Sequence, residues 1–283
     1  MPGSNARAIE KARTLPVDGI VLDLEDAVAP EAKAGAREQA FAAVRAGGFG
    51  AREVFVRLNS IETPWFADEL EAAAATPPDG IIVPKIAMPD QFERIGERLM
   101  SLKADTKTRV WAMIETPAAI FNLPALAAMA RDSETRLAGF VMGTNDLAKE
   151  THARLLPGRA PMLGWLSQAV LAARAYGIAI VDGVYNTIGD TEGFIRECEQ
   201  GRDFGFDGKA LIHPGQIGPC NEVFSPTASE IEDARGIIAA FERPENRDKG
   251  VVQIDGRMVE RLHAEMAART VAIADAIAAR RFA

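Results

Sequence analysis

The sequence predicts an α/β fold of the TIM (β/α)8 type, with a helical arm at its carboxyl end. Two observations predict it. Short runs rich in branched aliphatic residues alternate along the chain with alanine-rich segments that repeat apolar residues at helical spacing. Several apolar runs also end in a charged residue, as expected at the rim where a (β/α) barrel does its chemistry.

Seven strand-like runs recur, with helical patterns between them. The runs are Gly19 to Asp23, Glu53 to Leu58, Gly80 to Pro84, Arg109 to Ile114, Leu137 to Met142, Ile178 to Val181 and Phe206 to Ile212. The helical patterns include Ala6 to Arg13, Glu31 to Ala46, Pro64 to Ala75, Asp90 to Leu102, Pro117 to Ala130 and Met162 to Tyr176. This alternation implies a parallel sheet. A closed barrel needs eight strands, and Met1 to Asn5 leads directly into a helical pattern, so the first strand is expected to be truncated.

The alternation of strand-like runs and helical patterns ends at residue 225. We therefore expect a catalytic barrel over residues 1–224 and an arm over residues 225–283. The arm contains a helical pattern from Ala228 to Phe241, a hairpin-like Gly250 to Gly256 and a long helix from Met258 to Ala279. Such an arm has little barrel of its own to cover, so its apolar face is expected to pack on a neighbouring subunit.

Composition bounds the class of protein. With 283 residues, 48% of them hydrophobic, the chain can bury a full core. A net charge of -8 argues against a nucleic-acid surface, and no apolar stretch is long enough to span a bilayer. Two cysteines make no disulfide framework, and the cytoplasm is the expected compartment.

Two acidic residues follow successive strand-like runs and point to a metal site. Glu115 ends the run Ala-Met-Ile-Glu, and Asp146 follows Met-Gly-Thr-Asn about thirty residues later. A pair of carboxylates suits Mg²⁺, with Mn²⁺ as an alternative, and leaves positions open for water and substrate. The alternative is that each acid caps the helix that follows it. There is no Gly-x-Ser-x-Gly motif and no cysteine–histidine signature, so a serine or thiol nucleophile is not indicated.

Other charged residues gather at the same predicted rim. Arg57 ends the run Val-Phe-Val-Arg and offers a fork of donors for a carboxylate or an oxyanion. Its alternative role is a structural ion pair with Glu25 or Asp26. These two acids crowd one turn with Asp23, which is tolerable only beside a cation such as Arg57 or Lys85. Glu25, Asp26 and Lys85 are therefore expected to surround the metal ligands without binding the metal themselves.

Taken together, the motifs resemble a known family. They are Pro2-Gly-Ser-Asn-Ala-Arg-Ala-Ile-Glu-Lys11, Leu22-Asp-Leu-Glu-Asp-Ala-Val28, Val56-Arg-Leu-Asn59, Ile82-Val-Pro-Lys85, Met113-Ile-Glu-Thr-Pro117, Gly143-Thr-Asn-Asp-Leu-Ala-Lys-Glu150, Val181-Asp-Gly-Val-Tyr-Asn186 and Gly205-Phe-Asp-Gly-Lys-Ala-Leu-Ile-His-Pro214. In this order they resemble the citrate lyase beta subunit-like branch of the HpcH/HpaI aldolase superfamily. The short forms with these motifs are most similar to (3S)-malyl-CoA thioesterases and malyl-CoA lyases.

The resemblance implies a magnesium-dependent barrel that acts on acyl-CoA esters as a homotrimer or hexamer. Glu115 and Asp146 match the family's metal ligands, and Arg57 matches its substrate arginine, with Glu115 also beside the substrate. A carboxyl-terminal acid of the family reaches a neighbouring subunit's site as general base. In Gly256-Arg-Met-Val-Glu260 that acid is Glu260, where aspartate is common.

The expected reaction is retro-Claisen cleavage of a β-hydroxyacyl-CoA such as malyl-CoA or citramalyl-CoA. One alternative is a thioesterase that hydrolyses malyl-CoA to malate and CoA. Another is the citryl-cleaving subunit of a citrate lyase complex, which would need an acyl-carrier protein as partner. The products decide between lyase and hydrolase, because only the lyase releases an oxo acid.

Overall fold

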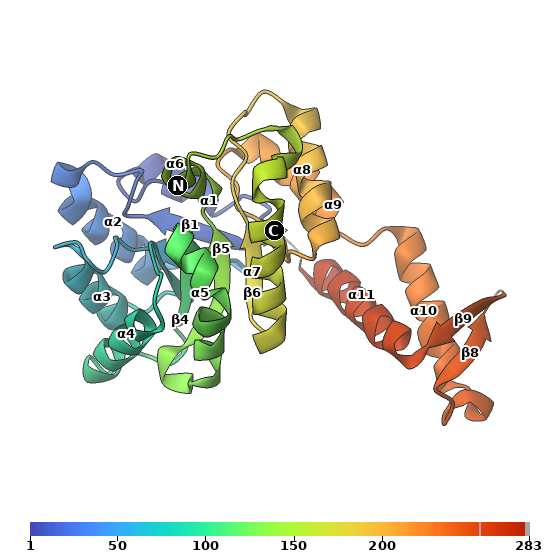
Figure 1. Ribbon diagram of the computed structural model, residues 1–283. Helices are drawn as coiled ribbons and strands as arrows, with labels where there is room; N and C mark the ends of the chain where they lie inside the picture. The colour runs from blue at the N-terminus through green and yellow to red at the C-terminus, as the bar shows by residue number, and fades with distance from the viewer. Residues whose placement is uncertain (255, 281–283) are drawn as a thin grey trace. The chain divides into compact units, whose positions relative to one another are not determined.

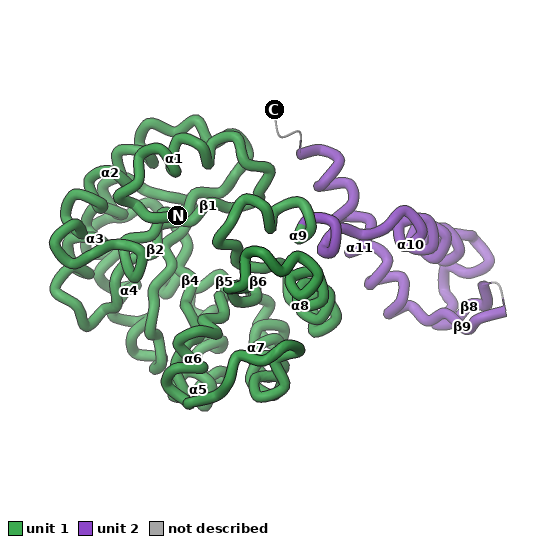
Figure 2. Tube along the Cα trace, turned by 90° about the horizontal axis from the view of Figure 1, so that it is seen from above, with its two compact units in different colours: residues 1–220 green, residues 221–283 purple. Residues whose placement is uncertain are grey.

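A computed structural model describes residues 1–254 and 256–280. The chain forms two compact units, residues 1–220 and residues 221–283, shown in different colours in Figure 2. The first unit contains every strand of the predicted barrel. The second contains a helical hairpin and a small β-hairpin.

The first unit is built on one parallel sheet of seven strands in sequential order. The strands are β1 (Gly19–Asp23), β2 (Glu53–Arg57), β3 (Gly80–Val83), β4 (Arg109–Ile114), β5 (Leu137–Met142), β6 (Ala179–Asp182) and β7 (Gly208–Lys209). The sheet is curled, and the long helices lie on its outer side (Figure 1). The register pairs Asp23 with Arg57 and Ile114 with Met142, so the ends of neighbouring strands meet at one edge.

The closed eight-stranded barrel is not formed by the residues that the structure describes. Their sheet runs from β1 to β7, and β7 has only two residues. The segment before the first helix follows β1 for a short distance: Pro2 makes an isolated parallel bridge to Asp23. The Asp23 N–H donates to the Met1 carbonyl at 2.8 Å, and the Gly3 N–H donates to the Asp23 carbonyl at 2.7 Å. Met1–Gly3 thus supplies a single bridge in place of an eighth strand.

The helices of the first unit begin and end at residues suited to those positions. They are α1 (Ala6–Ala12), α2 (Lys33–Ala46), α3 (Phe66–Ala75), α4 (Pro89–Ser101), α5 (Pro117–Ala128), α6 (Thr144–Thr151), α7 (Leu163–Tyr176), α8 (Thr191–Phe204) and α9 (Ile217–Phe224), the last of which runs into the second unit. Asn5 and Thr116 cap α1 and α5 with their side chains. Gly177 ends α7 with a positive φ of 69°, which glycine adopts without strain.

The second unit consists of α10 (Ala228–Glu242), the antiparallel strands β8 (Val251–Ile254) and β9 (Arg257–Glu260), and α11 (Arg261–Ala279). Its core is formed by Phe241, Val252 and Val259. The long helix begins at Arg261, not at Met258 as the sequence predicted. The reason is that Val259 pairs with Val252 across the hairpin and both are buried, which favours a strand at Arg257–Glu260.

Two further expectations can be compared with the structure. Cys198 and Cys220 are free and buried. No helix in the described part of the chain is long and apolar enough to cross a membrane.

Candidate active site

Charged side chains gather where the first strands of the sheet end. Asp23 is the last residue of β1, and Arg57 is the last residue of β2. Lys85 lies two residues beyond β3, and Glu115 directly follows β4. Because the strands are parallel and neighbours in the sheet, these ends share one edge.

Arg57 is held by Asp23. Its Nε and Nη2 donate to the two carboxylate oxygens of Asp23, each at 2.6 Å. Asp23 also accepts backbone N–H bonds from Glu25 and Ala27. Burial opposes ionisation of Asp23, but the bonds from Arg57 outweigh it and lower the pKa of the carboxyl. The structural ion pair foreseen for Arg57 exists, and its main partner is Asp23.

The third nitrogen of Arg57 faces the other two acids of the turn. Nη1 lies 3.0 Å from Glu25 Oε2 and 3.6 Å from Asp26 Oδ2. Lys85 Nζ donates to Glu25 Oε1 at 2.9 Å. Glu25 is buried, and burial raises its pKa despite these two cations. The Asp26 side chain is 62% exposed, so it contributes charge at the surface of the cluster.

Lys85 connects this cluster to Glu115. It adopts a left-handed backbone conformation with φ of 58°, which is uncommon for a residue other than glycine. In this conformation the Lys85 N–H donates to Glu115 Oε1 at 2.7 Å. The same residue therefore reaches Glu25 with its side chain and Glu115 with its backbone.

Glu115 and Asp146 form the candidate metal site. Glu115 is 1% exposed, and Asp146 is half-buried in the first turn of α6. Burial, followed by the negative charges of Glu25 and Asp146, raises the pKa of Glu115 to about 7. An added Cβ at Gly143 would lie 2.3 Å from the Glu115 Cβ and 2.7 Å from its Oε2, so only glycine leaves room for this side chain.

These features fit a divalent cation. The carboxylates of Glu25 and Asp146 repel that of Glu115, and the buried Glu25 Oε2 forms an ion pair with Arg57 Nη1 at 3.0 Å but accepts no hydrogen bond from the described residues. A hard cation relieves such repulsion and prefers oxygen ligands. Residues 1–254 and 256–280 contain no group of three or more His, Cys, Asp or Glu side chains placed to hold a metal ion, and that includes this site. The protein would therefore supply two carboxylates and leave the remaining positions open.

Sequence reasoning missed the residues that hold the β1 turn in place. Lys33 Nζ donates to the carbonyls of Leu24 and Glu25, and Asn59 Nδ2 donates to the Leu24 carbonyl. Glu69 in turn accepts from the backbone and side chain of Asn59. Asn59 was visible only as a member of the Arg-Leu-Asn motif. Lys33 and Glu69 lie on helices, where a single sequence gives no sign that they are buried.

A second pair of polar residues lies beside Asp146. The side-chain amides of Asn145 and Asn186 donate to each other at 3.1 Å and 2.7 Å. This reciprocal pair ties the start of α6 to the loop after β6. It places two exposed amides next to the candidate metal ligand.

Glu260, the predicted general base, lies in the second unit. It is the last residue of β9, and its backbone N–H donates to His263 Nδ1 at 2.9 Å. The six other predicted site residues, Glu25, Asp26, Arg57, Lys85, Glu115 and Asp146, belong to the first unit.

The comparisons with known proteins agree with the motifs and with this architecture. The family model described as HpcH/HpaI aldolase/citrate lyase matches residues 1–214. The chain belongs to the HpcH/HpaI aldolase/citrate lyase family. The resemblance inferred from the motifs is therefore confirmed.

Relatives within the HpcH/HpaI family carry two kinds of name. A (3S)-malyl-CoA thioesterase of Cereibacter sphaeroides is 46% identical, with 99% of this chain and 94% of the relative covered. The citrate lyase subunit beta of Leuconostoc mesenteroides is 32% identical, with 98% and 92% covered. The solved structure of CitE from Mycobacterium tuberculosis in complex with magnesium, acetoacetate and coenzyme A is 27% identical. Its TM-score is 0.76, and 96% of each chain is covered.

Proposed function

We propose that this protein is a magnesium-dependent thioesterase that hydrolyses a malyl-CoA-type ester to the free hydroxy acid and CoA. The gathering of Glu115 and Asp146 beside Arg57 and Lys85 carries the proposal, because a cation site next to two positive side chains suits a substrate rich in oxygen anions. The similarity to a (3S)-malyl-CoA thioesterase across 99% of the chain favours hydrolysis. This reverses the order of the sequence-based expectation, which placed the lyase first.

Glu115 and Asp146 would hold Mg²⁺, as the magnesium complex of a structural relative supports. When bound, the cation would polarise the carbonyl of the thioester and neutralise the acyl group's oxygens. Glu115 would offer Oε2, because its Oε1 already accepts from the Lys85 N–H. Gly143 leaves space on that side.

Arg57 and Lys85 would orient the acyl group. Arg57 Nη1 is the nitrogen not committed to Asp23, and the Arg57 side chain is 17% exposed. The Lys85 side chain is 41% exposed and so can turn toward a substrate carboxylate. Asp23 would act on the substrate only through Arg57: by holding two nitrogens of the guanidinium, it fixes the direction of the third.

Glu260 would act as general base in the site of a neighbouring subunit. Cross-strand pairs in the hairpin place Val252 and Val259 on the buried face, so Val251, Met258 and Glu260 share the outer face. Val251 and Met258 are 47% and 68% exposed. An acid beside exposed apolar side chains is what an arm that docks on another chain would present.

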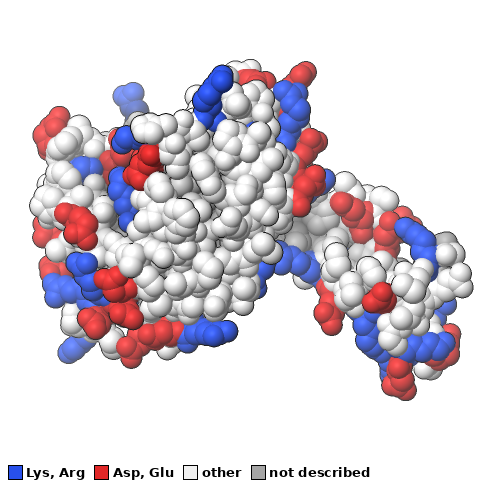
Figure 3. All heavy atoms as spheres, in the orientation of Figure 1, with Lys and Arg blue, Asp and Glu red and all other residues white. Residues whose placement is uncertain are grey.

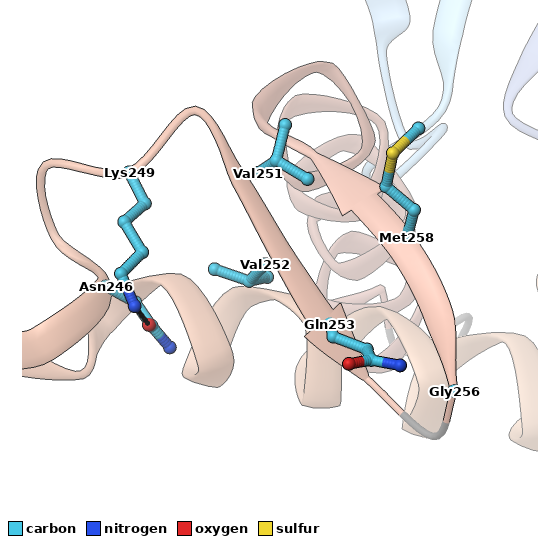
Figure 4. Close-up of a pocket in the computed structure, with 7 residues that line it drawn as sticks. All are labelled: Asn246, Lys249, Val251, Val252, Gln253, Gly256 and Met258. Carbon is cyan, nitrogen blue, oxygen red and sulfur yellow. Dashed lines mark hydrogen bonds between the residues drawn. The ribbon is translucent and has the colours of Figure 1, made fainter.

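A surface hollow supports this use of the hairpin. It measures about 560 Å³ and is lined by Asn246, Lys249, Val251, Val252, Gln253, Gly256 and Met258 (Figure 4). Lys249 Nζ donates to Asn246 Oδ1 at 3.0 Å along its edge. We propose that a segment of the neighbouring chain fills this hollow and brings Glu260 to that chain's carboxylates. There Glu260 would take a proton from water as it attacks the thioester carbonyl, and that proton would pass to the departing CoA sulfur.

The test is a product analysis. Purified protein with Mg²⁺ is incubated separately with (3S)-malyl-CoA, citramalyl-CoA and citryl-CoA, and products are identified by mass spectrometry. We expect malate and free CoA in equal amounts from malyl-CoA, without glyoxylate. Release of glyoxylate together with acetyl-CoA would contradict hydrolysis.

Retro-Claisen cleavage is the second candidate. Its support is the citrate lyase subunit beta that is 32% identical over 98% of the chain, together with the CitE structure. A cation held by the same carboxylates, together with Arg57, would then stabilise the enolate of the departing thioester. Glu260, acting as a base, would take the hydroxyl proton, and a proton would return to the enolate carbon. Cleavage of citryl-CoA, or of citryl groups carried only by an acyl-carrier protein, would favour the citrate lyase form of this reaction.

A further inference from the structure

A second group of buried charges lies at the ends of β6 and β7. Asp182 is the last residue of β6, and Lys209, its partner in the register, is the last residue of β7. Both side chains are fully buried, and the Arg159 side chain beside them is 4% exposed. Arg159 Nη1 donates to the two carboxylate oxygens of Asp182 at 2.7 and 2.8 Å, and Lys209 Nζ donates to Asp182 Oδ2 at 3.0 Å. These three residues are named here the Asp182 network.

The stability of the fold gives little reason for burying these charges. Lys, Arg, Asp and Glu side chains usually stay in contact with solvent, as those drawn in blue and red in Figure 3 do. A buried ion pair is often no more stabilising than apolar residues of the same volume. Arg159 also has a left-handed backbone with φ of 53°, and its buried Nη2 has no hydrogen-bond partner among the described residues. These features indicate that the network serves to fix the backbone next to it.

The backbone that the network holds is the start of the loop after β6. Lys209 Nζ donates to the Gly183 carbonyl at 2.6 Å, and the Gly183 N–H donates to Asp182 Oδ1 at 2.8 Å. Both polar groups of this glycine are thus bound to charged side chains, which form stronger hydrogen bonds than neutral ones do. Farther along the loop, the Tyr185 carbonyl accepts from Gln216 Nε2 at 3.0 Å.

The same loop contacts the first turn of α6, which carries Asp146. An added Cβ at Gly183 would lie 2.6 Å from Thr144 Oγ1 and 2.8 Å from Thr144 Cγ2, so the loop backbone packs directly on the first residue of α6. The reciprocal amide bonds of Asn145 and Asn186 join the same two segments. Asp146 follows Thr144 and Asn145 directly, so a shift of the loop would shift its carboxylate.

We propose that the Asp182 network positions Asp146 for metal binding, by holding residues 183–186 against the start of α6. The inference rests on the proposed metal site, of which Asp146 is one ligand. The members of the network are positioning residues, because they act on the cation only through the backbone of this loop. Removing groups that orient a metal ligand typically weakens metal binding by about tenfold to a hundredfold.

The experiment measures Mg²⁺ binding to the metal-free, full-length protein by titration calorimetry. Lys209→Met removes the bond to the Gly183 carbonyl and keeps the pair of Arg159 with Asp182. We expect it to raise the Mg²⁺ dissociation constant about tenfold. The loss of a positive charge would by itself favour a cation, so weaker binding in this variant reports a displaced ligand.

A second variant leaves every charge of the network in place. Gly183 lies outside the left-handed region, so alanine suits its backbone, and Gly183→Ala changes only the contact with α6. The added methyl group would push the loop away from Thr144, and the Mg²⁺ dissociation constant should again rise about tenfold. Adding Thr144→Ala makes room for the methyl group and should bring the constant back toward the wild-type value.

Asp207→Asn is the matched control. Asp207 directly precedes β7 and binds Arg174 at 2.7 Å and the Ile180 N–H at 2.8 Å, so the variant breaks an ion pair at the same two strands but outside the Asp182 network. It should unfold at a lower temperature and bind Mg²⁺ as the wild type does. A tenfold loss of affinity in this control would overturn the inference, because any disturbance of the two strands would then have the same effect.

Thermal unfolding and far-UV circular dichroism verify that each variant is folded, and Gly183→Ala decides the matter if Lys209→Met does not fold. Folded variants that bind Mg²⁺ as tightly as the wild type would overturn the inference and leave the network a purely structural feature. Asp146→Asn, measured in parallel, tests the metal site itself. If that variant also binds as the wild type does, the proposed metal site is wrong and this inference fails with it.

Discussion

The charged side chains of the site shift one another's pKa values and hold one another in ion pairs. Glu115, Glu25 and Asp146 gather within one cluster, and Arg57 is fixed mainly by Asp23. The sequence was sufficient to place these residues at strand ends. It could not show that Asp23 rather than Glu25 is the main partner of Arg57, because this depends on the pairing of Asp23 with Arg57 in the sheet. The roles of the site residues stay predictions that the following experiments test.

The first prediction is that turnover depends on a divalent cation held by Glu115. EDTA should abolish activity, and Mg²⁺ or Mn²⁺ should restore it. Glu115→Gln should weaken Mg²⁺ binding at least tenfold in calorimetry, since an amide is a poorer ligand for a hard cation than a carboxylate. Glu93→Gln, at an exposed glutamate of α4, is the control and should bind as the wild type does. Equal binding by both variants would rule out Glu115 as a ligand.

The second prediction concerns pH and the stability of the metal-free protein. Burial and neighbouring charges raise the pKa of Glu115 from an ordinary 4.5 to about 7 in the folded state. Its protonated form therefore stabilises the fold fully below about pH 4.5, and this contribution is lost as pH rises through about 7. Between these limits the wild type should lose up to about 3 kcal/mol of unfolding free energy relative to Glu115→Gln. Urea unfolding at several pH values measures the difference, and added Mg²⁺ should reduce it. A difference that does not vary with pH would contradict the raised pKa.

The third prediction is for Arg57→Lys, which keeps the charge but loses the fork. We expect kcat/KM to fall by an amount that corresponds to a loss of about 1.5 to 3 kcal/mol of transition-state stabilisation. Asp23→Asn serves as the comparison, because it loosens Arg57 without removing it. If Arg57 contacts the substrate, Arg57→Lys should impair catalysis more than Asp23→Asn at a similar loss of thermal stability. If both variants lose the same amount of kcat/KM, in proportion to their loss of thermal stability, Arg57 has a structural role only.

At the scale of elements, the loops after the strands position the ligands. The loop after β3 turns through the left-handed Lys85, and the loop after β5 passes Glu115 at Gly143. Periodicity predicted most helices and all seven strands of the sheet to within a few residues. It misplaced the start of α11, because Met258 and Val259 continue a helical pattern, and only their pairing across the hairpin reveals a strand.

The fourth prediction follows from the close approach at Gly143. Gly143→Ala would place a Cβ 2.3 Å from that of Glu115, so Glu115 must move and Mg²⁺ affinity should fall at least tenfold. Gly35→Ala on α2 meets nothing within 4 Å and should instead stabilise the helix by about 0.5 to 1 kcal/mol. Calorimetric titration and thermal unfolding of both variants provide the measurement. Unchanged metal binding in Gly143→Ala would contradict this prediction and show that the loop can move to accommodate the added methyl group.

At the scale of the whole molecule, the sequence predicted the alternating α/β architecture and a separate carboxyl-terminal segment. The closed barrel was not borne out by the described residues: in place of a full eighth strand, Pro2 adds one bridge to Asp23. The number of strand-like runs in the sequence shows that one strand of the barrel is missing. The sequence does not show which segment pairs with the edge of β1, because that contact produces no local sequence pattern.

The fifth prediction tests whether Glu260 completes the site of another chain. Glu115→Gln and Glu260→Ala should each be inactive as homo-oligomers. In hybrids formed from equal amounts, about one quarter of the sites would combine the intact Glu115 of a Glu260→Ala chain with the intact Glu260 of a Glu115→Gln chain. Activity should therefore return to about one quarter of the wild-type value. Differently tagged variants are co-expressed, purified as hybrids and assayed. Verified hybrids without activity, or a fully active Glu260→Ala, would remove Glu260 from a shared site.

The sequential strand order has a consequence for how the site is assembled during folding. Each strand of the sheet pairs with the next along the chain, from β1 to β7, so pairing can proceed from the amino end without long loop closures. Asp23, Glu25 and Arg57 meet once β1 and β2 have paired, and Lys85 joins with β3. Glu115 and Asp146 arrive only with β4 and α6. In that order of pairing, Arg57 and Lys85 are in place before Glu115 and Asp146 join the cluster, and the acids do not gather without neutralising cations.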